Sequence, residues 1–125
     1  MTARYTLKPQ QKTQRRVETI HPVKVDQGTK AAFDALARSQ GLSSRAALTQ
    51  LINLHAVLRQ PFEPRTPRPW GVKGSPERLV YTAALPSLMV SPDVGLALLI
   101  DGKRAGIRLP EAIRQLVWRC VQAGQ

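Results

Sequence analysis

The chain contains one short pattern twice, with the second copy 65 positions after the first. Val25 lies 16 residues before Gly41, and Val90 lies 16 residues before Gly106. An apolar helical pattern follows each glycine, reading GLSSRAALTQLI in the first copy and GIRLPEAIRQLV in the second. The matching pairs are Gly41/Gly106, Leu42/Ile107, Ala47/Ala112, Leu48/Ile113, Gln50/Gln115, Leu51/Leu116 and Ile52/Val117. A fixed internal period constrains the architecture first, because both copies are expected to form the same structural unit.

Each copy is too short to be stable alone. A unit of roughly 45 residues cannot bury enough apolar surface, so each copy needs a partner against which it can pack. The whole chain of 125 residues has the length of one compact domain or of two small ones.

The first copy begins with a segment that has the alternation of a β-strand. In residues 17–25 (VETIHPVKV), Val23 and Val25 share one face, and Pro22 and Lys24 share the other. Pro22 has no amide hydrogen to donate, so this strand is expected to lack one ladder hydrogen bond at that point.

Two helices are predicted after this strand. Asp26 is the expected N-cap of a helix over about 27–39, which Gly41 ends as a left-handed cap residue. Ser43 is the expected N-cap of the next helix, over about 44–58. The apolar residues that these helices should bury are Phe33, Leu36, Ala37, Ala47, Leu48, Leu51, Ile52, His55 and Leu58.

The second copy repeats this order of elements. A strand somewhere in 79–90 places Leu88 and Val90 on one face and Ser87 and Met89 on the other. Ser91-Pro92-Asp93 marks a helix start with a cap residue and a proline in the first turn. The predicted helices cover 92–104 and 109–122, and the latter should bury Ile113, Leu116, Val117, Cys120 and Val121.

Two segments lie outside the repeats. Residues 1–16 carry five positive charges and no acidic side chain, which is typical of a flexible basic arm. Residues 59–78 hold five prolines and five Lys or Arg, which predicts a stiff basic linker, and Trp70 within it needs a partner. The predicted organisation is an arm (1–16), a first unit (17–58), a linker (59–78) and a second unit (79–125).

The charge of the chain points to a polyanionic partner. The 19 Lys and Arg side chains exceed the 8 Asp and Glu side chains and leave a net charge of +11, which favours nucleic acid. A membrane surface is the rival partner, but the basic residues are scattered and form no long amphipathic helix. Because no stretch approaches 18 apolar residues and no signal-peptide core is found, we expect a cytoplasmic protein.

Catalytic chemistry has little support. The chain has two histidines and one cysteine, with no Gly-rich phosphate loop, no metal motif and no paired carboxylates at a helical spacing. His55 and Cys120 occupy the same position of the two copies, on the apolar stripe, and are interpreted as packed core residues. One cysteine also excludes an internal disulfide. We therefore expect neither an enzyme nor a bound cofactor or metal ion.

The order of strand, helix, glycine turn and helix resembles the ribbon-helix-helix (Arc/MetJ-type) DNA-binding family, here in tandem. The residues that carry the resemblance are V25-D26 … F33-x-x-L36-A37 … G41-L42-S43 … A47-L48-x-x-L51-I52, and V90-S91-P92-D93 … L98 … G106-I107 … A112-I113-x-x-L116-V117. The resemblance implies a mostly α fold with a short β-ribbon, in which two units pair as an intramolecular pseudo-dimer or as an intertwined homodimer. The sequence leaves both assemblies open.

The resemblance also implies a site on double-stranded DNA. In this family the paired strands lie in the major groove, and the outward residues that would read bases are Lys24, Pro22 and Ile20. The phosphate contacts would come from the start of the second helix and from the arm. These candidates are Ser43, Ser44, Arg45, Arg15 and Arg16.

The second copy departs from the family pattern. Its outward strand residues are Ser87 and Met89, and its helix start contains Pro110 and Glu111, which suit a phosphate poorly. The side chain of Arg108 is the remaining candidate for a phosphate contact. Asp101 and Gly102 also stand where the first copy has Leu36 and Ala37. We therefore expect the first copy to read DNA and the second mainly to build the fold.

The predicted function is sequence-specific DNA binding. The resemblance implies a transcriptional regulator or a plasmid or phage accessory factor of the relaxosome or partition type, associated with the nucleoid or a plasmid. One alternative is a protein-interaction module such as an antitoxin, in which the second unit, with Met89, Trp118 and Cys120, binds a protein partner. Another is an architectural binder that uses the charges of the arm and linker alone.

Overall fold

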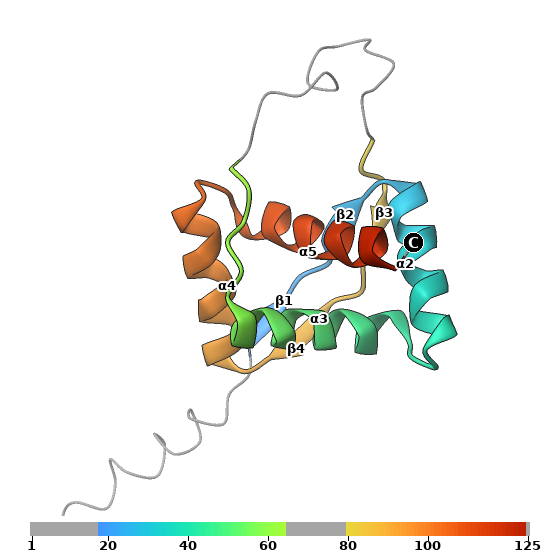
Figure 1. The fold of residues 1–125 in the computed structure, drawn as a ribbon, viewed down its shortest axis with the longest axis horizontal. Helices are drawn as coiled ribbons and strands as arrows, with labels where there is room; N and C mark the ends of the chain where they lie inside the picture. Colours follow the sequence, from blue (N-terminus) through green and yellow to red (C-terminus); the bar gives the residue numbers. More distant parts are fainter. Residues whose placement is uncertain (1–17, 65–79, 125) are drawn as a thin grey trace, which may run out of the picture.

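The fold is mostly helical, with two small antiparallel sheets. The structure, a computed structural model, describes residues 18–64 and 80–124. Within these residues lie four strands and four helices (Figure 1). The strands are β1 (Glu18–Ile20), β2 (Lys24–Val25), β3 (Ala83–Ala84) and β4 (Leu88–Val90), and the helices are α2 (Gln27–Ser39), α3 (Ser44–Leu58), α4 (Pro92–Arg104) and α5 (Leu109–Ala123).

The helices of the two halves follow the 65-residue offset of the sequence. Helices α2 and α4 have 13 residues each, α3 and α5 have 15 each, and every boundary in the second half lies 65 positions after its counterpart. The predicted helices at 27–39, 44–58 and 92–104 are confirmed at both ends, and α5 extends one residue beyond the prediction.

Both α2 and α4 end in the same glycine turn. Gly41 and Gly106 each have a φ of 74°, in the left-handed region where a side chain is unfavourable. The closing hydrogen bonds also correspond: the amide of Leu42 donates to the carbonyl of Ala37, and that of Ile107 to the carbonyl of Gly102, both over 2.9 Å. The predicted glycine caps are therefore confirmed.

The N-caps differ between the halves. The Asp26 carboxylate accepts from the amide of Thr29 over 3.0 Å, and Ser43 Oγ accepts from the amide of Ala46 over 3.1 Å, as predicted. Ser91 occupies the N-cap position of α4 without a side-chain cap bond, and Arg108 does the same for α5. Helices α4 and α5 instead begin with a proline in the first turn, which presets the helical φ.

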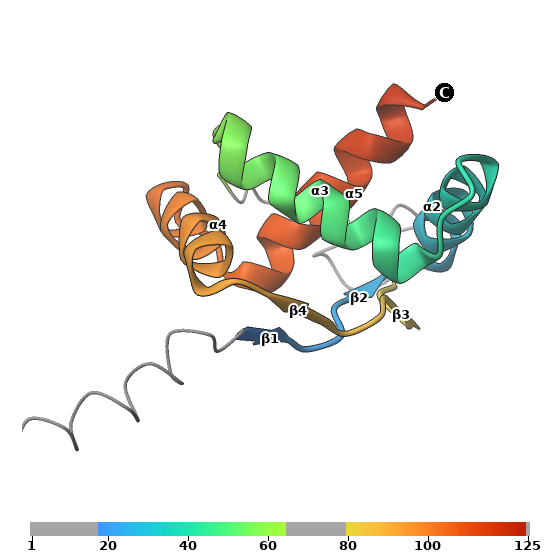
Figure 2. The same ribbon diagram turned by 90° about the horizontal axis from the view of Figure 1, so that it is seen from below.

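The strands of the two halves pair with each other within one chain. Strand β1 lies antiparallel to β4, with Thr19 opposite Met89. Strand β2 lies antiparallel to β3, with Lys24 opposite Ala84. The two pairs are equivalent under the 65-residue offset. Met89 is the counterpart of Lys24 and Ala84 is the counterpart of Thr19, so exchanging the two halves turns one pair into the other. Figure 2 shows all four strands on one side of the molecule and the helices on the other.

Proline interrupts the ladder between the two sheets. The amide of Leu85 donates to the carbonyl of Val23 over 2.8 Å, which continues the register of the β2–β3 pair. One step further along this register, Pro22 lies opposite Pro86, and neither residue has an amide hydrogen to donate. The missing hydrogen bond predicted at Pro22 is therefore observed, and it divides one ribbon into two short sheets. We call the strands and the residues between them, 18–25 and 83–90, the ribbon.

One core is built from both halves. The inward residues of the ribbon occur in matching triplets, Ile20, Val23 and Val25 in the first half and Leu85, Leu88 and Val90 in the second. They pack with fully buried side chains from all four helices: Phe33, Leu48, Ile52, Leu98, Ile113 and Val117. Because the two halves share this cluster, neither could keep its apolar residues covered without the other.

A disulfide across the ribbon tests whether the pairing is intramolecular. In a Cys120→Ser background, Thr19→Cys and Met89→Cys lie directly opposite each other, where Cα atoms are about 4.5 to 5.5 Å apart, a separation that a disulfide can span. We expect oxidation to give cross-linked monomers, measured by intact mass and non-reducing electrophoresis. The single variant Met89→Cys controls for dimers of an exposed thiol. Disulfide-linked dimers as the main product of the double variant would show that strands pair between chains.

Candidate nucleic-acid interface

The outward face of the ribbon is the surface that the predicted DNA site would use. Thr19, Lys24 and Ala84 are exposed there, and Met89 is 67% exposed. No helix of residues 18–64 and 80–124 covers this side of the strands (Figure 2). A two-stranded ribbon has the width that the major groove of B-DNA admits. Among the described residues, the face is therefore open along the length of the ribbon.

Two arginines tie the ribbon to the helices, one near its middle and one near an end. Arg45 Nε, at the start of α3, donates to the carbonyl of Ser87 over 3.1 Å. Arg114 Nε, on α5, donates to the carbonyl of Lys24 over 2.7 Å, and its guanidinium lies 4.3 Å from the centre of the Tyr81 ring. Each bond joins a helix of one half to the ribbon segment of the other half, and so fixes the position of the ribbon against the helices.

The face is chemically asymmetric. Lys24 and Met89 are counterparts under the 65-residue offset, and both side chains are exposed. One places an ammonium group near one end of the ribbon, and the other places a thioether near the opposite end. An ammonium donates hydrogen bonds to base acceptors, whereas a thioether offers apolar contact. The two ends therefore present different chemistry to a ligand.

The position predicted for Ile20 is corrected by the structure. Its side chain is 5% exposed and packs in the core instead of facing outward. Simple alternation fails because both His21 and Pro22 are exposed, so the inward residues are spaced by three at this point. Leu85 and Leu88 show the same spacing in the second half. Pro22 does lie at the surface, where it offers apolar contact without a donor.

The start of α3 brings together the predicted phosphate contacts of the first half. Ser43 Oγ is used as the helix cap, and Ser44 Oγ donates to the carboxylate of Asp34 on α2. Burial favours the neutral form of Asp34, but the hydrogen bonds from Lys30 and Ser44 outweigh it and lower the pKa of this carboxyl. The Ser44 hydroxyl hydrogen is thus engaged, whereas Ser43 Oγ accepts the cap bond and can still donate, so a phosphate here would meet the Ser43 hydroxyl, backbone amides of the first turn and the exposed side chain of Arg45.

The corresponding helix start in the second half is built differently. Arg108 is exposed at the N-cap position of α5. Pro110 and Glu111 occupy the first turn, and Glu111 forms an ion pair with Arg114 at 3.7 Å. The helix start therefore carries a negative charge that repels phosphate, and only the side chain of Arg108 remains suited to one. The other predicted phosphate residues, Arg15 and Arg16, lie outside the described residues.

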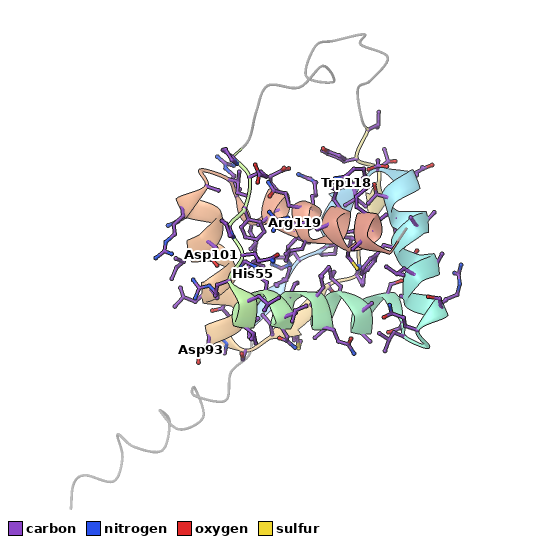
Figure 3. All side chains as sticks on the ribbon, viewed as in Figure 1. His55, Asp93, Asp101, Trp118 and Arg119 are labelled. Carbon is purple, nitrogen blue, oxygen red and sulfur yellow. The ribbon has the colours of Figure 1, made fainter. Side chains whose placement is uncertain are left out.

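A charged cluster of a buried histidine, a buried aspartate and the exposed Arg59 joins the end of α3 to α4. Arg59 donates from Nε to Asp101 Oδ2 over 2.6 Å and from Nη2 to Oδ1 over 2.7 Å. His55 Nε2 lies 2.9 Å from Asp101 Oδ2. His55 and Asp101 are 4% and 6% exposed, and Figure 3 shows them between the two helices. Arg59 lowers the pKa of Asp101, and Asp101 in turn raises the pKa of Arg59.

The cluster explains why the second half has Asp101 at a position where the repeat pattern would place an apolar residue. Asp101 stands where the first half has Leu36, and its carboxylate is held by residues that the first half supplies. The ring of Phe62 stacks on His55 with 4.8 Å between ring centres and covers it. The His–Asp pair is therefore enclosed in the fold, which suits a structural role.

The remaining candidates of the second half lie apart from each other. Met89 is exposed on the ribbon, and Trp118 is 53% exposed on α5 (Figure 3). Cys120 is half-buried, and burial raises the pKa of its thiol, so the reactive thiolate is disfavoured.

Among residues 18–64 and 80–124, no helix is long and apolar enough to cross a membrane. Comparison of the chain with protein-family models, curated proteins and solved structures gave no match.

Proposed function

We propose that this chain is a tandem ribbon-helix-helix protein that binds double-stranded DNA in a sequence-specific manner. Its two units would pair within one chain and place the outward face of the ribbon in the major groove. The observation that carries this proposal is the antiparallel pairing of the strands of the first half with those of the second, backed by helices and exposed on the other face. A paired ribbon of this kind is a known reader of the major groove.

The charge distribution supports the same proposal. The net charge of +11 supplies affinity for the phosphate backbone that does not depend on sequence. Lys24 would supply sequence dependence, because an ammonium group donates well to the O6 and N7 atoms of guanine. Arg45 and Arg108 flank the proposed interface at the starts of α3 and α5. Backbone contacts would thus position the ribbon, and side chains on it would read bases.

The proposed target is a non-palindromic site. A homodimeric ribbon presents the same residues twice and favours a palindrome, whereas this ribbon presents Lys24 in one half and Met89 in the other. The thioether would suit the methyl group of thymine better than an acceptor atom. The biological role that fits such binding is transcriptional regulation or an accessory function in plasmid transfer or partition.

Selection of bound duplexes from a random DNA pool tests this proposal. At near-physiological salt we expect a short motif without twofold symmetry to be enriched by the full chain. The same selection with Lys24→Ala should lose the guanine preference in one half of the motif. Binding that enriches no motif and disappears as salt rises would instead indicate a basic scaffold without sequence recognition.

The role of the arm is tested by its removal. Deleting residues 1–16 removes five positive charges. We expect lower affinity for every DNA sequence and a shallower dependence of the binding constant on salt, because fewer counterions are released. Titrations at several salt concentrations measure both effects. An unchanged slope would show that the arm makes no phosphate contact.

A further inference from the structure

A short segment after α3 is bound by side chains of α5 and α4. Residues 59–64, which we call the strap, contain no helix or strand and run from the end of α3 past α5 (Figure 1). The aromatic ring of Phe62 is 5% exposed, and it lies between His55 and the guanidinium of Arg119, which is 5.4 Å from the ring centre. The strap is thus anchored by one aromatic side chain.

The main chain of the strap is also recognised. Gln115 Oε1 accepts from the amide of Glu63 over 2.9 Å, and Gln115 Nε2 donates to the carbonyl of the same residue over 2.8 Å. Arg119 Nη2 donates to the carbonyl of Pro61 over 2.8 Å. One glutamine and one arginine of α5 therefore hold a non-helical segment by its backbone, which leaves the sequence of that segment little constrained except at Arg59 and at the aromatic position.

Each residue that holds the strap has a counterpart in the other half, at the same offset of 65. The pairs, with the strap-side residue first, are Asp101/Leu36, His55/Cys120, Arg119/Leu54, Gln115/Gln50 and Arg59/Gly124. All these counterparts except Gln50 line a groove of about 410 Å³ between α2, α3 and the end of α5. Its further lining residues include Leu51 and Leu58, and also His55, Gln60 and Arg119, so the groove adjoins the strap site. The groove is thus the counterpart of the strap site.

No part of residues 18–64 or 80–124 fills this groove as the strap fills its own site. Leu54 and Leu58 are 51% and 56% exposed. Gln50 is exposed on α3, one turn from Leu54, and its amide has no hydrogen bond within the described part of the chain. Where the strap site has the Arg59–Asp101 ion pair, the groove has Gly124 beside Leu36. These two residues are in close contact, because a Cβ added to Gly124 would lie 3.0 Å from Leu36 Cδ1.

We propose that this groove binds a non-helical, aromatic-containing segment of a partner protein, in the manner of the strap. The aromatic side chain would lie against Leu36, Leu54 and Cys120, and the amide of Gln50 would pair with the backbone of the segment. The groove is lined by no acidic side chain, and the chain carries a charge of +11, so an acidic segment is favoured. Because the groove lies among α2, α3 and the end of α5, on the side away from the ribbon, DNA and the partner can bind together (Figure 2).

A displayed library of random 12-residue peptides, selected on the immobilised full chain, tests this site. We expect enriched peptides to share an aromatic residue with flanking acidic residues. Leu54→Arg should weaken their binding at least tenfold, measured by fluorescence polarisation of a labelled peptide. Gln50→Ala, at an exposed position, should weaken it about fivefold without disturbing the fold. Val57→Arg is the matched control, because Val57 is exposed on the same helix outside the groove.

Three results would overturn the proposal. Peptide binding that is insensitive to both Leu54→Arg and Gln50→Ala would place the peptides elsewhere. A concentration-dependent dimer in sedimentation that Leu54→Arg abolishes would assign the groove to a second copy of this chain. Peptide binding only after Trp70→Ala would assign it to the linker of this chain. Thermal unfolding of each variant checks the fold, and Lys24→Ala should leave peptide affinity unchanged, so this test is separate from that of DNA binding.

Discussion

Replacing Asp101 with alanine is expected to lower the free energy of unfolding by about 3 kcal/mol, because the buried carboxylate that pairs with the buried His55 and with the partly exposed Arg59 is removed. The carboxylate is 6% exposed and accepts two hydrogen bonds from Arg59 and one from His55. Without it, His55 remains buried with its Nε2 unpaired, and Arg59 loses the contacts that favour its left-handed φ of 53°. Denaturant unfolding at pH 7 measures the change.

The matched control is Asp93→Ala on the same helix. Asp93 is exposed in the first turn of α4 (Figure 3), so its removal loses only a favourable interaction with the helix dipole. We expect a loss of about 0.5 kcal/mol there. If Asp101→Ala cost no more than Asp93→Ala, the cluster would be solvated and would not stabilise the fold.

The cluster also predicts a dependence of stability on pH. Arg59 lowers the pKa of Asp101 in the folded state, so the cluster stabilises the fold fully above the unfolded pKa of about 4. This stabilisation is lost as pH falls through the lower folded value. Asp101→Asn should therefore flatten the decline of stability below about pH 4, and Asp34, whose pKa is also lowered, accounts for part of the slope that remains. An identical slope in the variant and the parent would exclude this role.

Local signals made the helices predictable. Asp26, Ser43, Gly41 and Gly106 act within one turn of their own position, through cap hydrogen bonds and positive φ. Such interactions depend on the neighbouring sequence alone, so the boundaries could be predicted to within a residue. His55 was also correctly interpreted as a buried position on the apolar stripe of α3.

Long-range partners could not be predicted in this way. Asp101 was visible as a departure from the repeat, but its partner Arg59 lies 42 residues away in the chain. Phe62 lies in the part of the predicted linker that the structure describes, and it proves to be a core residue. A lone aromatic between two prolines directly after a helix was the available signal. The phase change at His21 and Pro22, which buries Ile20, depends on the proline pair across the ribbon.

Removing the Lys24 side chain is the second change with a large expected effect. Lys24→Ala should weaken binding to the selected DNA site by about 1–3 kcal/mol, since a base contact is lost. Lys103→Ala is the matched control, because it removes the same charge from an exposed position near the end of α4. That control should weaken binding to all sequences slightly and equally. Equal effects of the two substitutions would remove Lys24 from the reading face.

Changes at Met89 test whether the second half contributes to recognition. If that half is mainly structural, Met89→Ala should leave the selected motif almost unchanged, and a shifted motif would show that the thioether reads a base. Met89→Lys is the sharper experiment, because it places an ammonium at the counterpart of Lys24. Since the register of the ribbon is related by the same offset, a second guanine preference should arise at the twofold-related position and make the motif more symmetric. A motif that gains no second guanine preference in this variant would contradict docking of this face in the major groove, because the substitution places an ammonium at both ends of the ribbon.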